Sequence, residues 1–238
     1  MNNADRVIWN SIVLYSKIII CIVLSLWCVP IILRALGVND FGLYNLIAGL
    51  VAMLAFLKTA MTSSTQRYLS IQRGKGDAQE LLSVYNISLL VHWIIACAIL
   101  ILGFALEPWL FNGFLNIEPT RINAAKIIYI CLLISTIFTI VAIPYDATLN
   151  AYENMPVFAA IEILDQLLRL GLALSLLHIN IDRLIFYGVG MASIQVMNFM
   201  VKWAYTHYKY KHLYLSLSLF KNPILFRQMF SFASSKRD

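Results

Sequence analysis

The sequence predicts an all-α integral membrane protein: a bundle of six transmembrane helices followed by a basic amphipathic C-terminal tail. Six long apolar runs fill the first 206 residues, and most match the ~20 residues that a helix needs to cross ~30 Å of hydrocarbon. The chain is 61% hydrophobic and 13% charged, whereas a soluble domain carries ~25% charged residues. The connections between the runs are short, so the sequence leaves no room for a soluble catalytic domain.

The predicted spans are 9–33, 41–60, 86–106, 124–149, 157–177 and 184–205. Residues 1–206 would form the six-helix lobe, and residues 207–238 would form the tail. Gly37 is a helix-stop signal after the first span, and Asn39-Asp40 is typical of a turn. The second run reaches the length of a span only by including residues 58–60, and its helix is expected to continue through Arg67.

Turn and proline signals punctuate the remaining spans. Residues 74–77 (GKGD) predict a turn before the third span. The segment 109–123 is expected to be the longest loop on the opposite side. Pro144 should kink the fourth span because it lacks an amide donor, and Pro156 takes a favoured first-turn position in the fifth. Residues 180–182 predict a tight turn before the sixth span.

The net charge of +6 follows the expected topology, so it does not indicate a nucleic-acid partner. With the N-terminus inside, segments 1–8, 58–85 and 202–238 hold twelve Lys and Arg residues, and the outer loops hold four. This bias favours cytoplasmic N- and C-termini. The first apolar run is too long for the core of a cleavable signal peptide, so we expect it to be the first span.

The tail, 207–238, carries six basic residues and one acid, interleaved with Tyr, Leu and Phe. Such a segment either lies on an anionic leaflet or is an ordinary positive-inside flank. Residues 230–235 resemble the start of a seventh helix, which the sequence does not complete.

No catalytic or metal-binding motif is present, so no enzyme activity or cofactor is expected. The four cysteines lie in apolar runs without metal-site spacing and are expected to be small packing residues. A lipid-modifying transferase is the alternative from the enzyme class. It would need a catalytic set at the membrane face, where the chain offers only Asp77, Glu80 and Glu153.

Charged residues inside the spans are the candidates for function, because each costs at least ~2.5–3.5 kcal/mol at a helix centre on insertion scales. Asp165 and Arg169 are four residues apart and are expected to pair, with Glu162 on the same stripe. The full set is Lys17, Lys58, Asp146, Glu162, Asp165 and Arg169.

Two interpretations of these charges stay open. They line a polar cavity that is open to the cytoplasm and binds an anionic or sugar-bearing ligand, or they form inter-helix salt bridges. Lys58 has the further alternative of extending to the membrane interface. A cavity predicts that cysteines placed at residues 165 or 169 react with aqueous thiol reagents.

Four blocks of the sequence carry a resemblance: 31–44 (IILRALGVNDFGLY), 62–70 (TSSTQRYLS) with 74–77, 143–147 (IPYDA) with 151–155 (AYENM), and 226–233 (FRQMFSFA). They resemble bacterial polysaccharide exporters, in particular O-antigen and lipopolysaccharide flippases. These proteins belong with the multidrug/toxin-extrusion transporters and the lipid II flippase.

The resemblance implies one lobe of a two-lobe transporter in the bacterial inner membrane, whose lobes rock around a central cavity. Its substrate would be an undecaprenyl-pyrophosphate-linked oligosaccharide, moved from the cytoplasmic to the outer leaflet. Basic residues suit a pyrophosphate head group, with the acids balancing charge or coupling to an ion. The expected cavity or head-group contacts are Lys17, Arg34, Lys58, Arg67 and Arg169.

The chain departs from this family by offering one lobe only. It would be truncated, paired with a separate second lobe, or a homodimer, and we expect that it does not transport alone. Two alternative functions remain: a drug or cation extruder of the same superfamily, and a non-transporting remnant.

Overall fold

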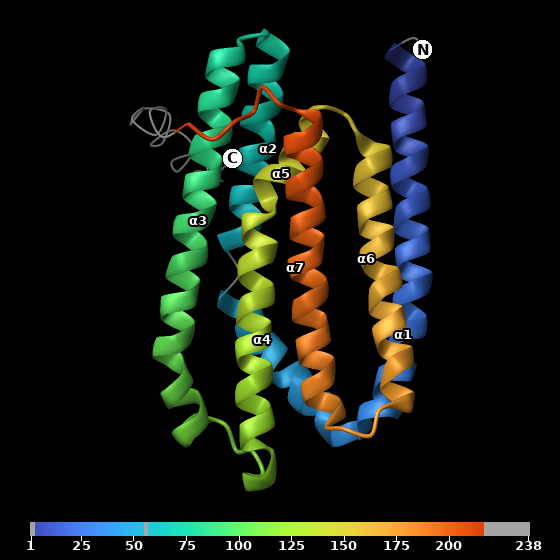
Figure 1. Cartoon of the computed structure of the whole chain (residues 1–238), viewed down its shortest axis with the longest axis vertical. Coiled ribbons are helices and arrows are strands. Elements are labelled where there is room, and N and C mark those ends of the chain that lie inside the picture. The colour runs from blue at the N-terminus through green and yellow to red at the C-terminus, as the bar shows by residue number, and fades with distance from the viewer. Residues whose placement is uncertain (1–2, 55–56, 217–238) are drawn as a thin grey trace, which may run out of the picture.

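The computed structural model describes residues 3–54 and 57–216; for residues 3, 4, 6, 54 and 57–61 only the backbone is described. Within these residues every regular element is helical: α1 (Asn3–Leu54), α2 (Leu57–Lys75), α3 (Ala78–Trp109), α4 (Ile122–Val141), α5 (Ile143–Ala151), α6 (Met155–Ser175) and α7 (Arg183–Lys209), with short π and 3-10 turns at Leu110–Phe114, Pro119–Arg121 and Leu176–His178. Figure 1 shows an elongated bundle in which the N-terminus and the end of α7 lie at the same end.

The protein is an all-α membrane protein. Four helical stretches of the described chain are long and apolar enough to cross a bilayer: Val7–Met53, Ala78–Phe114, Pro119–Ala151 and Arg183–Lys209. The first stretch contains a reversal of the chain, and α6 is of spanning length but carries three charges. The predicted count of six crossings therefore remains a prediction.

The reversal within α1 occurs at Gly37, whose φ of 79° and ψ of 167° leave the helical region. An L-residue with a side chain is strained at this φ, so glycine suits the position. The predicted helix stop at Gly37 is confirmed. The predicted turn at Asn39-Asp40 is wrong, because the helix resumes directly after Gly37 and Asp40 is buried in an ion pair.

Several predicted boundaries shift because helices extend beyond their apolar runs. The helix expected to continue through Arg67 ends only at Lys75, and Gly76 (φ 76°) makes the turn. Asp77 then accepts hydrogen bonds from the amides of residues 79 and 80, so α3 begins at Ala78 and not near residue 86. The predicted loop 109–123 is largely helical turns, and its Phe111 packs against Tyr129.

The proline signals are confirmed. The helix breaks at Ala142, two residues before Pro144, and this separates α4 from α5. Pro156 lies in the first turn of α6. Asp182 ends the predicted tight turn by capping α7 through the amides of residues 184 and 185.

The last helix, α7, continues to Lys209, three residues into the predicted tail. The chain then crosses to α3, where the buried Asn86 side chain donates to the Tyr214 carbonyl (3.0 Å) and accepts from the Ser216 amide (2.9 Å). The rest of the expected tail and the start of a seventh helix, residues 217–238, lie outside the described residues.

Small residues allow α4 and α7 to pack closely. A Cβ added at Gly188 would lie 2.2 Å from Ile128 Cδ1, which is the close approach that small residues permit between membrane helices. By contrast, α6 packs mainly along α1 at the edge of the bundle (Figure 1). This leaves polar side chains of α6 and α7 facing one another across a cavity.

Candidate functional site

A cavity of about 260 Å³ lies among α4, α5, α6 and α7, with Thr62 of α2 on its wall. Its charged lining residues come from three helices. They are Asp146 on α5, the predicted stripe of Glu162, Asp165 and Arg169 on α6, and Lys202 on α7. The lining residues are Thr62, Phe138, Thr139, Ala142, Ile143, Asp146, Phe158, Glu162, Asp165, Arg169, Gln195, Asn198, Phe199 and Lys202.

Lys202 is the cation that joins these helices. Lys202 is buried, with 4% of its surface exposed. The Nζ atom lies 2.8 Å from Asp146 Oδ1 and 3.0 Å from Glu162 Oε1. One ammonium group is therefore shared by two carboxylates, and we call Lys202, Asp146 and Glu162 the cavity triad.

The predicted pair on α6 is confirmed. Arg169 Nε donates to Asp165 Oδ2 at 2.6 Å, and Asn198 Nδ2 of α7 donates to the other carboxylate oxygen at 3.1 Å. The Arg169 Nη1 group also lies 3.7 Å from the Met191 sulfur. Asp165 thus has a cation of its own, unlike the two carboxylates that share Lys202.

Two polar stripes of the same spacing create this arrangement. On α6 the members are residues 162, 165 and 169, and on α7 they are residues 195, 198 and 202. Spacings of three and seven residues return to one face of a helix. Gln195 extends the contact to α4 by donating to Thr139 Oγ1 at 2.6 Å.

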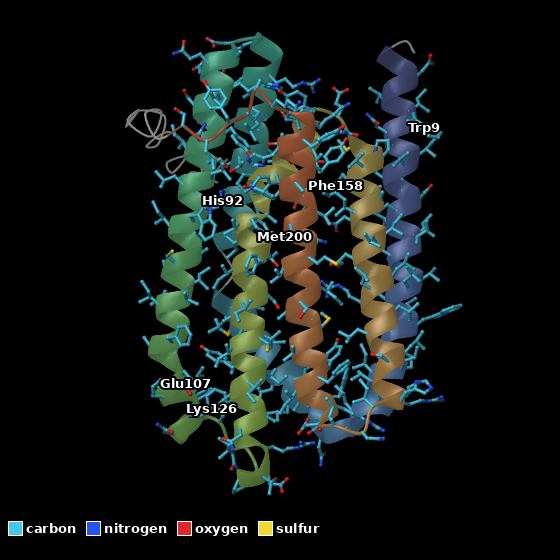
Figure 2. The ribbon with its side chains drawn as sticks, viewed as in Figure 1. Trp9, His92, Glu107, Lys126, Phe158 and Met200 are labelled. Atoms are coloured by element: carbon cyan, nitrogen blue, oxygen red, sulfur yellow. The ribbon has the colours of Figure 1, made fainter. Side chains whose placement is uncertain are left out.

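An aromatic ring stands at the edge of the cavity between two lysines. The Nζ atom of Lys17 on α1 lies 4.9 Å from the Phe158 ring centroid, and Lys202 Nζ lies 6.0 Å from it. Figure 2 shows Phe158 near the start of α6, toward the end of the bundle that holds the N-terminus. Cations gain from such ring faces when water is scarce.

The structure thus brings together Asp146, Glu162, Asp165 and Arg169 from the predicted site, with Lys17 at its margin. Arg34 and Arg67 are exposed and do not line this cavity, so their role as head-group contacts stays a prediction. Lys58 belongs to α2, but its side chain lies outside the described residues.

Sequence reasoning missed Lys202. The charge pattern groups Lys202 with the basic flank 202–238, whereas its side chain is buried among helices. The signal was available: Lys202 lies inside the apolar run 184–205, three residues before its end, and Gln195 and Asn198 precede it on the same face. In this structure the ion pairs form part of a cavity wall, so both interpretations describe the same residues. That the cavity opens to the cytoplasm and binds a ligand stays a prediction.

The site can hold a small charged or hydroxyl-rich group. Among the described residues no group of three or more His, Cys, Asp or Glu side chains is arranged to hold a metal ion. Amide, ammonium and guanidinium donors line it together with carboxylates, and three phenylalanines supply the apolar part.

In comparisons with known proteins, no family, curated protein or solved structure matches this chain.

Proposed function

We propose that this bundle is one lobe of an exporter that moves lipid-linked oligosaccharide, such as an O-antigen repeat unit, across a bacterial inner membrane by alternating access. The observation that carries the proposal is the set of five charged side chains around one cavity inside a membrane-embedded bundle. Each charge costs at least ~2.5–3.5 kcal/mol at a helix centre on insertion scales, so such residues mark substrate or ion pathways. No catalytic motif accompanies them.

The donors of the cavity suit a sugar pyrophosphate. Lys202 and Arg169 offer charge-assisted hydrogen bonds to phosphate oxygens. Gln195 and Asn198 offer amide groups to sugar hydroxyls. The four sequence blocks that resemble polysaccharide flippases support the same substrate class.

The cavity is too small to enclose such a substrate. About 260 Å³ is below the ~300–1,000 Å³ of pockets for drug-sized ligands, and a lipid-linked oligosaccharide is larger still. We therefore propose that this lobe holds the head group while a second lobe, or a second copy, covers the glycan. The chain alone is expected to bind substrate without flipping it.

We propose that the N-terminal end of the bundle faces the cytoplasm. With Lys202 placed inside the bundle, eleven basic residues remain in the proposed inner segments against four in the outer loops. An impermeant thiol reagent added to intact cells tests this. In a cysteine-free background a cysteine at residue 180 should react and one at residue 79 should not, since both positions are exposed at opposite ends of the bundle; the reverse pattern would invert the topology.

Binding by the full chain in detergent tests the substrate class. Undecaprenyl-pyrophosphate-linked N-acetylglucosamine should raise the melting temperature, whereas undecaprenol should not. The Arg169→Gln variant should show a smaller rise. The Arg183→Gln variant is the control and should show the full rise, because the wild-type Arg183 guanidinium donates to the Ala35 carbonyl away from the cavity. Equal shifts with both lipids would refute the proposal, and flipping by the chain alone in vesicles would refute the one-lobe part.

A second candidate function, drug or cation extrusion, is favoured by one feature of the same cavity. Three carboxylates and three phenylalanine rings line it, and this combination attracts organic cations. Binding of ethidium to the wild-type protein tests this function. Binding that is lost in the Asp165→Asn variant and is unchanged by added lipid-linked sugar would favour this function over the first.

A further inference from the structure

The chain leaves the last helix by crossing the end of the bundle. Figure 1 shows residues 210–216 running from the end of α7 toward α3, and we call this segment the strap. Tyr210 and Leu213 are buried, whereas Tyr214 and Leu215 are 57% and 62% exposed. Lys211 is exposed as well. The strap therefore has one side against the bundle and one side that faces outward.

Hydrogen bonds and a ring contact hold the strap at both ends. At the α3 end the buried Asn86 side chain bonds to the backbone of residues 214 and 216. At the α7 end the Asn154 amide donates to the Tyr210 hydroxyl at 3.2 Å. The centroids of the Tyr152 and Tyr210 rings lie 4.3 Å apart. The outward side chains of the strap are therefore held in place relative to the bundle.

The strap lies at the depth where the apolar part of the bundle ends. The apolar run of α3 begins at residue 86, and that of α7 ends at residue 205. The strap joins these two levels, because it starts just after α7 and is bonded to the residue 86 side chain. Trp and Tyr are enriched at the boundary between hydrocarbon and water. Trp203, Tyr208 and Tyr214 are exposed here, so the strap has the composition of an interfacial segment.

Two lysines at this place lack a counter-ion. Residues 203–216 contain Lys209 and Lys211 and no acid. Both lysines are exposed, and neither forms an ion pair in the part of the chain that the structure describes. At the opposite end of the bundle, by contrast, Lys126 is paired with Glu107. Unpaired ammonium groups beside exposed tyrosines suit an anionic partner at the membrane surface.

We infer that the strap and the last turn of α7 form a binding surface for the head groups of anionic phospholipids. Lys209 and Lys211 bind the lipid phosphates, and Tyr214 and Leu215 enter the interface beside them. The charge pattern alone left an ordinary positive flank as the alternative, and the fixed position of the strap favours the lipid surface. The inference does not rest on the proposed function, because its ligands are lipids of the surrounding bilayer.

Native mass spectrometry of the full chain measures this binding. Dioleoylphosphatidylglycerol is titrated into the protein in detergent, with dioleoylphosphatidylcholine as the zwitterionic reference. The wild-type protein should bind phosphatidylglycerol more tightly than phosphatidylcholine. Lys209→Gln and Lys211→Gln should each weaken the binding of phosphatidylglycerol by about fivefold. The double variant should lose most of the preference between the two lipids.

A matched control removes the same charge from the other end of the bundle. Arg34 is exposed there and Lys126 is partly exposed, so the double variant Arg34→Gln with Lys126→Gln should bind phosphatidylglycerol as the wild type does. Lys209→Arg with Lys211→Arg keeps both charges and should keep the preference.

Asn86→Ala tests the contribution of the strap. This variant keeps both lysines but loses the side chain that bonds residues 214 and 216, so its affinity for phosphatidylglycerol should fall. An affinity equal to that of the wild type would overturn the role of the strap and leave an ordinary positive flank. If Asn86→Ala fails to fold, the variants of the two exposed lysines still decide.

Three further outcomes would overturn the inference. The first is equal affinity of the wild type for the two phospholipids, and the second is a double lysine-to-glutamine variant that binds as the wild type does. The third is displacement of phosphatidylglycerol from this surface by undecaprenyl-pyrophosphate-linked N-acetylglucosamine, which would make a transported lipid the occupant. The phospholipid titrations involve neither transport nor the cavity, so their failure would leave the proposed function standing.

Discussion

Among the residues that the structure describes, two places have one cation shared by two carboxylates, and they differ in what surrounds them. The cavity triad lies within the bundle, with the Lys202 side chain 5% exposed. The second place lies at the end opposite the N-terminus. There the Arg121 guanidinium contacts Asp40 and, at 2.6 Å, Asp182, and we call these three residues the corner triad. The Arg121 side chain is 35% exposed.

The corner triad has structural tasks that explain its residues. Asp182 caps α7 through two backbone amides, and Asp40 lies just after the reversal at Gly37. Arg121 joins both to the start of α4, beside an open hollow of about 420 Å³. In the cavity triad both carboxylates contact the Lys202 ammonium group, which joins α5, α6 and α7 inside the bundle.

The free-energy cost of removing the shared cation should therefore differ between the two triads, because one is buried and the other is partly exposed. Removing one partner from a buried ion pair leaves an uncompensated charge at a cost of about 3–5 kcal/mol. Water limits this cost where a side chain is one-third exposed, because pairs at the surface contribute only ~0–1 kcal/mol.

The largest effect is expected from Lys202→Met. Two carboxylates would lose the buried ammonium group that they share. We therefore expect a destabilisation of about 3–5 kcal/mol, seen as loss of the monodisperse peak and of the thermal transition in detergent. Lys202→Arg retains the charge and should retain the peak.

A compensated variant tests the reason for this loss. Lys202→Met combined with Asp146→Asn and Glu162→Gln removes every charge of the triad, and it should recover most of the stability. A triple variant as unstable as Lys202→Met alone would show that Lys202 matters through packing, and the contrast between the two triads would then have no electrostatic basis.

Arg121→Met is expected to cost less, up to about 2 kcal/mol, because it loses two ion pairs that contribute ~0–1 kcal/mol each where water reaches them. The effect should shrink when the melting temperature is measured at high salt, since salt screens exposed charges. A loss equal to that of Lys202→Met and insensitive to salt would place the corner in the same class as the cavity.

Contacts within one helix could be predicted from the sequence, whereas contacts between helices could not. The Asp165–Arg169 pair follows from a spacing of four residues on one helix. Lys202 instead meets partners 56 and 40 positions away in the sequence, and Arg121 meets Asp40 across 81 positions. Such pairs depend on which helices become neighbours, and hydrophobic patterning does not encode that. The helix reversal at Gly37 was readable because a single residue makes it.

Gly37→Ala should destabilise by about 1–2 kcal/mol, because an L-residue is strained at a φ of 79°. A Cβ at this position meets no atom within 4 Å, so the cost comes from the backbone alone. Gly42→Ala is the matched control: its Cβ is equally unobstructed and its backbone is helical. Equal melting temperatures for the two variants would show that the corner adapts, and the corner triad would then not depend on this turn.

The smallest effect is expected at a third ion pair, which calibrates the other two. Lys126 Nζ lies 3.0 Å from Glu107 Oε1, with the two side chains 40% and 27% exposed; Figure 2 shows both at the end of the bundle opposite the N-terminus. Lys126→Gln should therefore cost only ~0.5 kcal/mol, a barely measurable change in melting temperature. If depth determines the energetic weight of a charge, the losses must rise from Lys126 through Arg121 to Lys202. A Lys126 variant as damaged as the Arg121 variant would break that order and show that the number of carboxylate partners, or the Phe111 ring 5.7 Å from the ammonium group, matters as much as burial.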